Sequence, residues 1–310
     1  MCRGGMLELS ACRLRKNKRR TLMNLNPLSA GCNHEGCAGK ISYKSKMAQT
    51  ICFLNHKGGV AKTTSCASLA TALWIMGKKV LCIDTDQQCN LSGVLGFSQQ
   101  EGDPTLSDWL GGNIAPPVYE KYPGLDYVPA SKALRNMESE LLNRRSRETI
   151  LARKLAVLKP HYDYVIIDCA PGDSVLNDNA LSASDSVIIP TECSGFSLQG
   201  MQNLLFAIDE IRQEINPGLH VGGYLMVKYD KTTRIAREVS EYFERQQDVP
   251  TLRTRIRRCI KFDESPLQHQ TIFEYAPDSN GAEDYMLLAE ELTGLKRPAD
   301  YQEKLRGLTC

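Results

Sequence analysis

The sequence predicts an α/β fold, in which a doubly wound and mostly parallel sheet has helices on both faces. From Met47 onward, short runs of β-branched and other apolar residues alternate with longer helical patterns. The short runs are apolar throughout, without alternating polar residues, which is typical of parallel strands buried on both faces. With 310 residues, the chain is long enough for one large α/β domain with appendages.

The individual elements follow from these runs and from the turn residues that separate them. A helical pattern over 63–76 ends at Gly77. A polar, helix-prone stretch covers 131–158, and further helices are expected at about 233–246 and at 281–293. The expected strands are 50–55, 79–84, 162–168, 185–190 and 220–227.

The first 46 residues differ from the rest of the chain in charge and in pattern. They contain ten Lys or Arg residues and two Glu residues, a net charge of +8. Because the whole chain has a formal charge of +2, the remaining residues carry −6. The segment lacks helical or strand periodicity, so we expect a basic, disordered lead over 1–46, a folded domain over 47–294 and a C-terminal tail over 295–310.

The twelve cysteines do not indicate a disulfide framework. Cys52, Cys82 and Cys169 lie inside apolar runs, and Cys66 lies in a helical pattern. Such cysteines behave as small apolar residues in a reducing compartment, which indicates a cytoplasmic protein.

Two further classes of protein are disfavoured by the sequence. In the lead, the spacing of Cys32, His34 and Cys37 fits no common zinc pattern, and a fourth ligand is not evident. No uninterrupted apolar run approaches the roughly 18–20 residues that a transmembrane helix needs. We therefore expect neither a zinc site nor a membrane span.

The stretch HKGGVAKTTS, residues 56–65, joins the first expected strand to the first expected helix. A strand, a glycine-rich loop and a helix in this order form the usual context of a phosphate-binding loop. Gly58 and Gly59 allow the backbone to approach phosphates, and the following amides and helix N-terminus can point at their oxygens. Lys62 supplies a charge for the β- and γ-phosphates, and the Thr63 hydroxyl is placed to ligate Mg²⁺.

This loop departs from the commonest phosphate-loop pattern, G-x-x-x-x-G-K-[ST]. His56 and Ala61 stand where that pattern has glycine, and a left-handed backbone at Ala61 would cost about 1 kcal/mol. The loop instead matches K-G-G-x-x-K-[ST] and so resembles the deviant Walker A box of the ParA/MinD group of P-loop ATPases. The expected ATP-binding residues are Lys57, Gly58, Gly59, Val60, Ala61, Lys62, Thr63 and Thr64.

The resemblance extends over essentially all of residues 47–294. VLCIDTDQQCNLS (80–92) is similar to the second acidic box of the group, D-x-D-P-Q-G-N, with Gln87 in place of proline and Cys89 in place of glycine. YDYVIIDCAPG (162–172) resembles the Walker B strand. The stretches VIIPTECSGFSLQGMQNL, YDKTTRIAREV, FDESP and NGAEDYMLLAEELTG are also similar to ParA, most closely to Soj-type partition ATPases.

The resemblance implies roles for particular residues. Lys62 would serve the nucleotide of its own subunit, whereas Lys57 would reach across a dimer interface to the partner's ATP, as an arginine finger does. Asp86 would orient the attacking water, and Asp168 would hold Mg²⁺ through water. Lys228 stands near the expected position of the base and is a weak ATP-binding candidate.

Two of these residues have simpler alternative interpretations that the sequence leaves open. Lys57 could be a solvated loop lysine, because nothing in a single sequence shows a dimer. Asp84, the first aspartate of the acidic box, could simply cap or turn the chain at the end of its strand.

As a function, the resemblance implies an ATP- and Mg²⁺-dependent partition or positioning ATPase that is cytoplasmic and nucleoid-associated. Its ATP-bound homodimer would bind double-stranded DNA without sequence preference. A ParB-like or adaptor protein would stimulate hydrolysis and release it, thereby segregating a plasmid, a chromosome or a protein cargo.

Two alternatives belong to other classes. A MinD-like membrane-cycling ATPase would need a basic amphipathic C-terminal helix, and ADYQEKLRGLTC carries few large apolar residues. An iron–sulfur electron carrier like the nitrogenase iron protein would need a pair of cysteines per subunit, for which Cys169 is one candidate.

A cluster of cations near the C-terminal third is the candidate DNA-binding surface. We call these residues the arginine strip. A charge run is often no more than a solvated face, but the group has basic residues at the positions of Arg258 and Lys261. The arginine strip consists of Arg253, Arg255, Arg257, Arg258 and Lys261.

Overall fold

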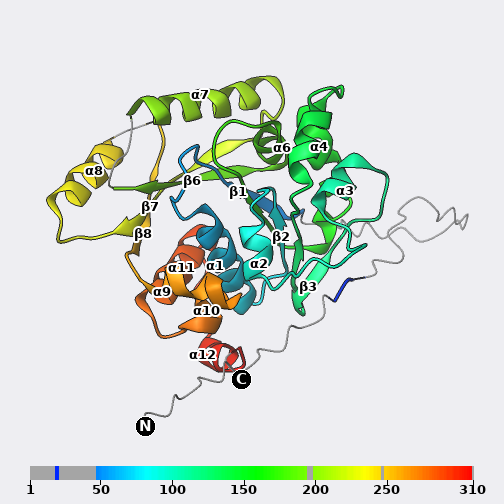
Figure 1. Ribbon diagram of the computed structural model, residues 1–310. Coiled ribbons are helices and arrows are strands. Elements are labelled where there is room, and N and C mark those ends of the chain that lie inside the picture. Colours follow the sequence, from blue (N-terminus) through cyan, green and yellow to red (C-terminus); the bar gives the residue numbers. More distant parts are fainter. Residues whose placement is uncertain (1–17, 21–46, 194–197, 246–247, 309–310) are drawn as a thin grey trace, which may run out of the picture.

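The computed structural model describes residues 18–20, 47–193, 198–245 and 248–308 (Figure 1). It contains an eight-stranded sheet in the order β3-β4-β2-β5-β1-β6-β7-β8. β3 and β4 are antiparallel, and the other pairs of neighbouring strands are parallel. The strands are β1 (Gln49–Phe53), β2 (Val80–Asp84), β3 (Tyr119–Tyr122), β4 (Leu125–Val128), β5 (Tyr164–Asp168), β6 (Ser186–Glu192), β7 (His220–Tyr229) and β8 (Thr251–Arg257).

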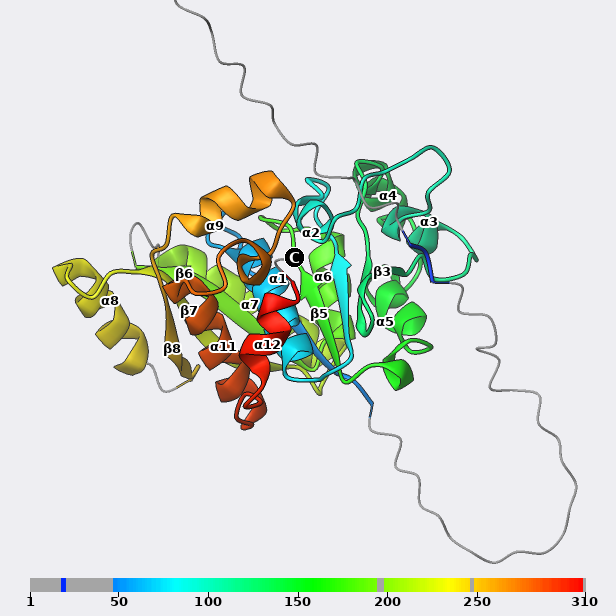
Figure 2. The same cartoon turned by 90° about the horizontal axis from the view of Figure 1, so that it is seen from below.

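Helices cover both faces of this sheet, which confirms the predicted fold class (Figure 1). The view in Figure 2 shows α1, α11 and α12 together on one face. The helices are α1 (Lys62–Ile75), α2 (Asn90–Val94), α3 (Leu106–Gly111), α4 (Leu134–Leu141), α5 (Ile150–Leu155), α6 (Val175–Ala183), α7 (Leu198–Glu214), α8 (Arg234–Arg245), α9 (Lys261–Glu264), α10 (Ile272–Tyr275), α11 (Asn280–Thr293) and α12 (Tyr301–Arg306).

Side chains of each central strand alternate between two hydrophobic cores, one on each face of the sheet. In β2, Val80 and Cys82 pack into the core under α1 and α11, whereas Leu81 and Ile83 pack into the core under α6 and α7. Successive side chains of a strand point to opposite faces, so a strand covered on both faces must be apolar at every position. This explains why the predicted central strands end within a few residues of the observed ones.

Three strands were not predicted. β3 and β4 occupy a stretch where tyrosines and charged residues alternate, and β8 occupies part of the arginine strip. In β8, Leu252 and Ile256 are buried between exposed or half-buried arginines, a pattern that suits an edge strand. The helix-prone stretch 131–158 is divided into α4 and α5 by turns and a short 3₁₀ helix over Arg147–Thr149.

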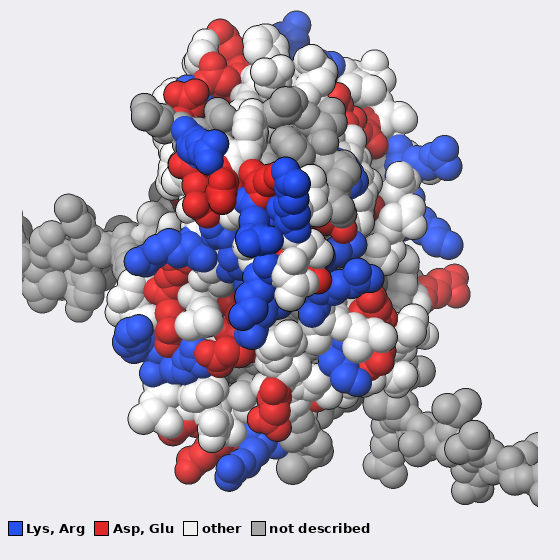
Figure 3. Space-filling model, turned by 90° about the vertical axis from the view of Figure 1, so that its left-hand side faces the viewer, with Lys and Arg blue, Asp and Glu red and all other residues white. Residues whose placement is uncertain are grey.

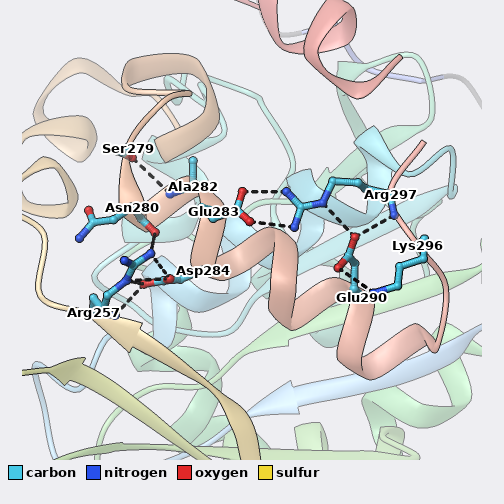
Figure 4. Close-up of polar contacts among 9 residues, drawn as sticks. All are labelled: Arg257, Ser279, Asn280, Ala282, Glu283, Asp284, Glu290, Lys296 and Arg297. Atoms are coloured by element: carbon cyan, nitrogen blue, oxygen red, sulfur yellow. Dashed lines mark hydrogen bonds and ion pairs between the residues drawn. The ribbon is translucent and has the colours of Figure 1, made fainter. Parts of the chain in front are cut away.

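Carboxylates on α11 cover the exposed edge of β8. The Glu291 carboxylate accepts hydrogen bonds from the amides of Arg253 and Thr254, at 2.7 and 2.8 Å. Two helical turns before Glu291 in α11, the buried Asp284 carboxylate accepts hydrogen bonds from Arg257. The amide of Arg257 donates at 2.8 Å and its guanidinium at 2.7–3.1 Å (Figure 4). Two carboxylates thus satisfy edge amides that would otherwise be open to another strand.

The C-terminal residues after α11 are held by a second group of ion pairs. Arg297 donates to Glu283 and to Glu290 of α11 at 2.7–3.0 Å (Figure 4). Its guanidinium also lies over the Tyr301 ring. Lys304 of α12 donates to the carbonyl of Ile75 at the end of α1. Leu305 is buried, so α12 packs its apolar side chain against the fold.

Asp284→Asn should lower the free energy of unfolding by about 2 kcal/mol, because the guanidinium of Arg257 would lose its charged partner and one of the two acceptor oxygens would become an NH2 donor. Because the Arg257 side chain is half-exposed, the expected loss of unfolding free energy is smaller than for a fully buried ion pair. Urea unfolding followed by circular dichroism measures the change.

The matched control for this prediction is Glu241→Gln, which removes the exposed pair with Arg245 within α8. A change of less than about 0.5 kcal/mol is expected there. Equal losses in the two variants would contradict the structural role of Asp284.

Candidate functional site

A hollow of about 670 Å³ opens at the carboxyl ends of the central strands. In open α/β sheets, ligands commonly bind outside the carboxyl ends of the strands. The loop between β1 and α1 forms one wall, and residues after β2, β6, β7 and β8 form the others. Of the predicted site residues, Gly58, Gly59, Val60, Ala61, Lys62, Thr63, Thr64, Asp86, Lys228 and Arg258 line this hollow.

The Asn55 side chain at the start of the glycine-rich loop ties its backbone to the neighbouring strand β6. The Asn55 side chain accepts the amide of Lys57 at 3.0 Å and donates to the carbonyl of Pro190 in β6 at 2.8 Å. Gly59 and Ala61 both have left-handed backbones, with φ of 74° and 58°. The pattern G-x-x-x-x-G-K-[ST] has glycine at this position, and glycine adopts a left-handed backbone more easily than alanine does. Ala61 adopts it nevertheless, directly before the first residue of α1.

Lys62 is almost completely buried beneath this loop. Its ammonium donates to the carbonyls of Asn55 and Lys57, at 2.8 and 3.0 Å. Burial lowers the pKa of Lys62, and the carboxylates of Asp168 and Asp86 act in the opposite direction. The ammonium is thus held inside the curve of its own loop, where a bound phosphate would lie.

Asp84 is a structural residue of the loop after β2. One oxygen accepts the amide of Asp86 at 3.1 Å, and the other accepts the amide and hydroxyl of Ser92 at 2.8 and 2.6 Å. Burial raises the pKa of Asp84 to about 6, while the bonds from Ser92 lower it. This geometry supports the capping and turning alternative for Asp84.

Asp86 and Asp168 lie at the same end of neighbouring strands. Asp86 faces the hollow, and one of its oxygens accepts the amide of Gln88 at 2.9 Å. Asp168 is fully buried, and among the described residues one of its carboxylate oxygens has no hydrogen-bond partner. Burial, followed by the charge of Asp84, raises the pKa of Asp168 well above its usual range, and a hydrogen bond from Thr63 opposes this rise.

These residues fit a magnesium ion. An unpaired buried carboxylate oxygen is costly, and a cation held directly or through water would compensate for it. The Thr63 hydroxyl lies in the same hollow as the loop that would hold the phosphates. Thr63 and Asp168 are therefore the residues of this chain that would hold Mg²⁺ beside a nucleotide.

Lys57 lies apart from Lys62, on the outer side of the loop. Its ammonium is 3.5 Å from a carboxylate oxygen of Glu192 at the end of β6, and the Lys228 ammonium is 3.7 Å from the other oxygen. The Lys57 side chain is 45% exposed, so it can be reached from outside the subunit. The structure brings Lys57 and Lys228 together around Glu192, which the sequence did not indicate.

The arginine strip is divided between two environments. Four of its cations are already paired with carboxylates: Arg253 with Glu291, Arg255 with Glu244, Arg257 with Asp284 and Lys261 with Glu264. Among the described residues, no carboxylate lies within ion-pair distance of Arg258, which lines the nucleotide-sized hollow. Figure 3 shows Lys and Arg gathered with acidic side chains on the side of the molecule that carries α8 and α9.

Sequence reasoning missed the apolar part of the hollow. Ile256 comes from β8, and Phe262 comes from α9, where its ring packs against Tyr285 of α11 at 5.6 Å between centroids. These residues are distant in sequence from the glycine-rich loop. The similarity of FDESP to ParA is the signal that could have drawn attention to Phe262.

The fold and this site together define a P-loop ATPase. The family described as AAA domain matches residues 48–221. The chain is 35% identical to the sporulation initiation inhibitor protein Soj of Bacillus subtilis, with 79% of this chain and 98% of Soj covered. It is also 35% identical to the chromosome partitioning protein ParA of Myxococcus xanthus, with 79% of this chain and 88% of that protein covered.

A solved structure agrees with this assignment. The cobyrinic acid a,c-diamide synthase of Mycobacterium smegmatis, with bound ADP and magnesium, is 32% identical. The match covers 81% of this chain and 98% of that chain, with a TM-score of 0.68. The chain belongs to the ParA/MinD group of deviant Walker A ATPases, as the resemblance implied, and ATP and Mg²⁺ are its cofactors.

Ala61→Gly should raise the free energy of unfolding by up to about 1 kcal/mol, because glycine adopts a left-handed backbone without the steric cost that alanine has. Chemical denaturation without nucleotide measures the difference. Ala72→Gly, within α1, is the control and should lower stability by about 1 kcal/mol or more. A loss of stability in Ala61→Gly would contradict the strain at this position.

Proposed function

We propose that this ATPase is a partition or positioning protein whose ATP-bound dimer binds DNA. In the proposed cycle, two subunits enclose two ATP molecules, the dimer binds duplex DNA without sequence preference, and a ParB-like partner stimulates hydrolysis and release. The observation that supports this proposal most directly is the different placement of the two loop lysines. Lys62 is turned into its own loop, whereas Lys57 lies outside it and half-exposed.

In the dimer, Lys57 supplies its charge to the phosphates of the partner's ATP. Charge from a second subunit stabilises a phosphoryl-transfer transition state as an arginine finger does. To reach across, Lys57 has to leave Glu192, which it approaches at 3.5 Å in the single subunit. Lys228 also contacts Glu192 and can neutralise it after Lys57 has moved.

The remaining site residues act within one subunit. Asp86 faces the hollow and orients the attacking water. Thr63 and Asp168 would hold Mg²⁺, which would supply positive charge to the phosphates. Ile256 and Phe262 offer apolar surface to the base, with Lys228 at its margin.

The ion pairs within the arginine strip indicate which of its cations are available to contact DNA phosphates. Among the described residues, no carboxylate lies within ion-pair distance of Arg258, and Lys261 pairs with Glu264, three residues away on the surface. Arg253, Arg255 and Arg257 contact acidic side chains of α8 and α11, so their first role is structural. We therefore assign the phosphate contacts mainly to Arg258 and Lys261.

Both alternative functions have less support in the structure. For a membrane cycler, the C-terminal helix should offer an apolar face, but Leu305 of α12 is buried. Among the described residues, no helix has the length and apolarity to cross a membrane. For an iron–sulfur carrier, Cys169 should be accessible near a second subunit, but it is 1% exposed inside the core.

Lys62→Ala should abolish ATP binding, while Lys57→Ala should bind ATP but fail to dimerise and to hydrolyse it. Calorimetric titration with ATP and size-exclusion chromatography with and without ATP measure the two properties. Lys78→Ala, at the far end of α1, is the control and should behave like wild type. Full turnover by the Lys57 variant would rule out a role across the interface.

DNA binding should require ATP and fall steeply with salt, because a dimer doubles the cations that face a duplex. Arg258→Ala/Lys261→Ala should reduce the salt slope by up to about four contacts per dimer. Fluorescence anisotropy on random duplex DNA over a salt series measures this effect.

The control for DNA binding is Arg135→Ala/Arg145→Ala, which removes two exposed cations from the α4 side of the molecule. It should bind DNA like wild type. Binding that does not depend on nucleotide, or that is weakened equally by both double variants, would argue against the assigned surface.

A further inference from the structure

Two carboxylates lie directly opposite each other at the β3 edge of the sheet. Glu120 of β3 and Asp126 of β4 are partners in the antiparallel register. Like charges in directly opposed positions destabilise a strand pair. Asp126 is also fully buried, where an uncompensated charge is costly. A nearby cation would therefore stabilise this pair of carboxylates.

Residues 18–20 of the basic N-terminal segment supply it. Arg20 approaches Asp126 at 2.5 Å and Glu120 at 3.3 Å, so one guanidinium bridges both carboxylates. Lys18 adds a second ion pair to Glu120 at 2.7 Å. The Tyr162 hydroxyl also donates to Asp126, at 2.8 Å, from the segment before β5.

The backbone of the same three residues pairs with the open edge of β3. Arg19 and Tyr119 form an antiparallel bridge. The amide of Arg20 donates to the carbonyl of Val118 at 2.9 Å, and the amide of Glu120 donates to the carbonyl of Lys18 at 3.0 Å. Extended segments that add to a sheet edge gain affinity from such main-chain bonds and specificity from side-chain pockets.

From these contacts, we infer that the β3 edge with Glu120 and Asp126 is a docking site for an extended, arginine-bearing segment, and that residues 18–20 of the same chain occupy it. Arg20 is the specificity residue, because it is the one that reaches the buried carboxylate. Residues 18–20 thus belong to the fold although they lie within the predicted disordered lead. The inference does not depend on the proposed function.

Burial raises the pKa of Asp126, whereas the Tyr162 hydrogen bond and the Arg20 charge lower it. Arg20 stabilises the ionised form of Asp126, so its contribution is present at higher pH and is lost as Asp126 takes up a proton. The neighbouring charge of Glu120 also raises the pKa of Asp126.

The test compares Arg20→Ala with Arg19→Ala in the full chain. Hydrogen exchange of the Glu120 amide reports docking, since the acceptor of this amide is the carbonyl of Lys18. In Arg20→Ala, this amide should exchange about tenfold faster or more. The melting temperature should fall by roughly 3–6 °C at pH 7 and by less at pH 4.5. Arg19→Ala, which removes a neighbouring cation without a carboxylate partner among the described residues, should leave both quantities unchanged.

A second variant covers the case in which Arg20→Ala is too unstable to study. In Arg20→Ala/Asp126→Asn, both charges are gone, so the melting temperature should recover toward wild type while the Glu120 amide stays unprotected. An added peptide with the sequence of residues 14–23 should bind Arg20→Ala more tightly than wild type, where the site is filled.

Three results would overturn the inference. The first is a Glu120 amide that exchanges as fast in the wild type as in Arg20→Ala. The second is an effect of Arg19→Ala equal to that of Arg20→Ala, which would indicate only the general charge of the segment. The third is protection that rises with protein concentration, which would place the segment on a second copy of the chain.

Discussion

The site is organised by the burial of opposite charges at the carboxyl ends of β1, β2 and β5. A lysine and several aspartates share this space, and each would be costly there without compensation. Asp84 is compensated by local donors, and Lys62 by the carbonyls of its own loop. Asp168 keeps one oxygen without a partner among the described residues. The central strands therefore converge on a place that fits the phosphates and Mg²⁺ of the proposed cycle.

The sequence predicted the buried half of this architecture better than its edges. β1, β2, β5 and β6 are covered on both faces, so their composition alone identifies them. The sequence indicated only a charged strip over β8, because the partners of Arg253 and Arg257 lie on α11, where Glu291 and Asp284 are more than 25 positions away in sequence. Such pairing over long distances leaves no local pattern.

The same contrast holds for the site. The phosphate loop is contiguous, so its lysines, glycines and threonines were recognised from one short stretch. The loop also carries a local sign of strain that the sequence anticipated: Ala61 stands at a glycine position and has a φ of 58°. In the acidic box after β2, Cys89 likewise stands where the family pattern has glycine, and its φ is 57°. Ile256 and Phe262 come from separate elements and could not be placed beside the loop without the fold.

Covering both borders of the sheet limits how two subunits can meet. In the described part of the chain, Asp284 and Glu291 occupy amides along β8, and residues 18–20 lie along β3. Within the residues that the structure describes, neither border therefore offers a long free row of donors and acceptors on which a second molecule could add strand by strand. Growth of one continuous sheet through many copies is thereby disfavoured. In the proposed cycle, two subunits meet instead at the surface around the mouth of the nucleotide hollow, where a small molecule can make and break the contact.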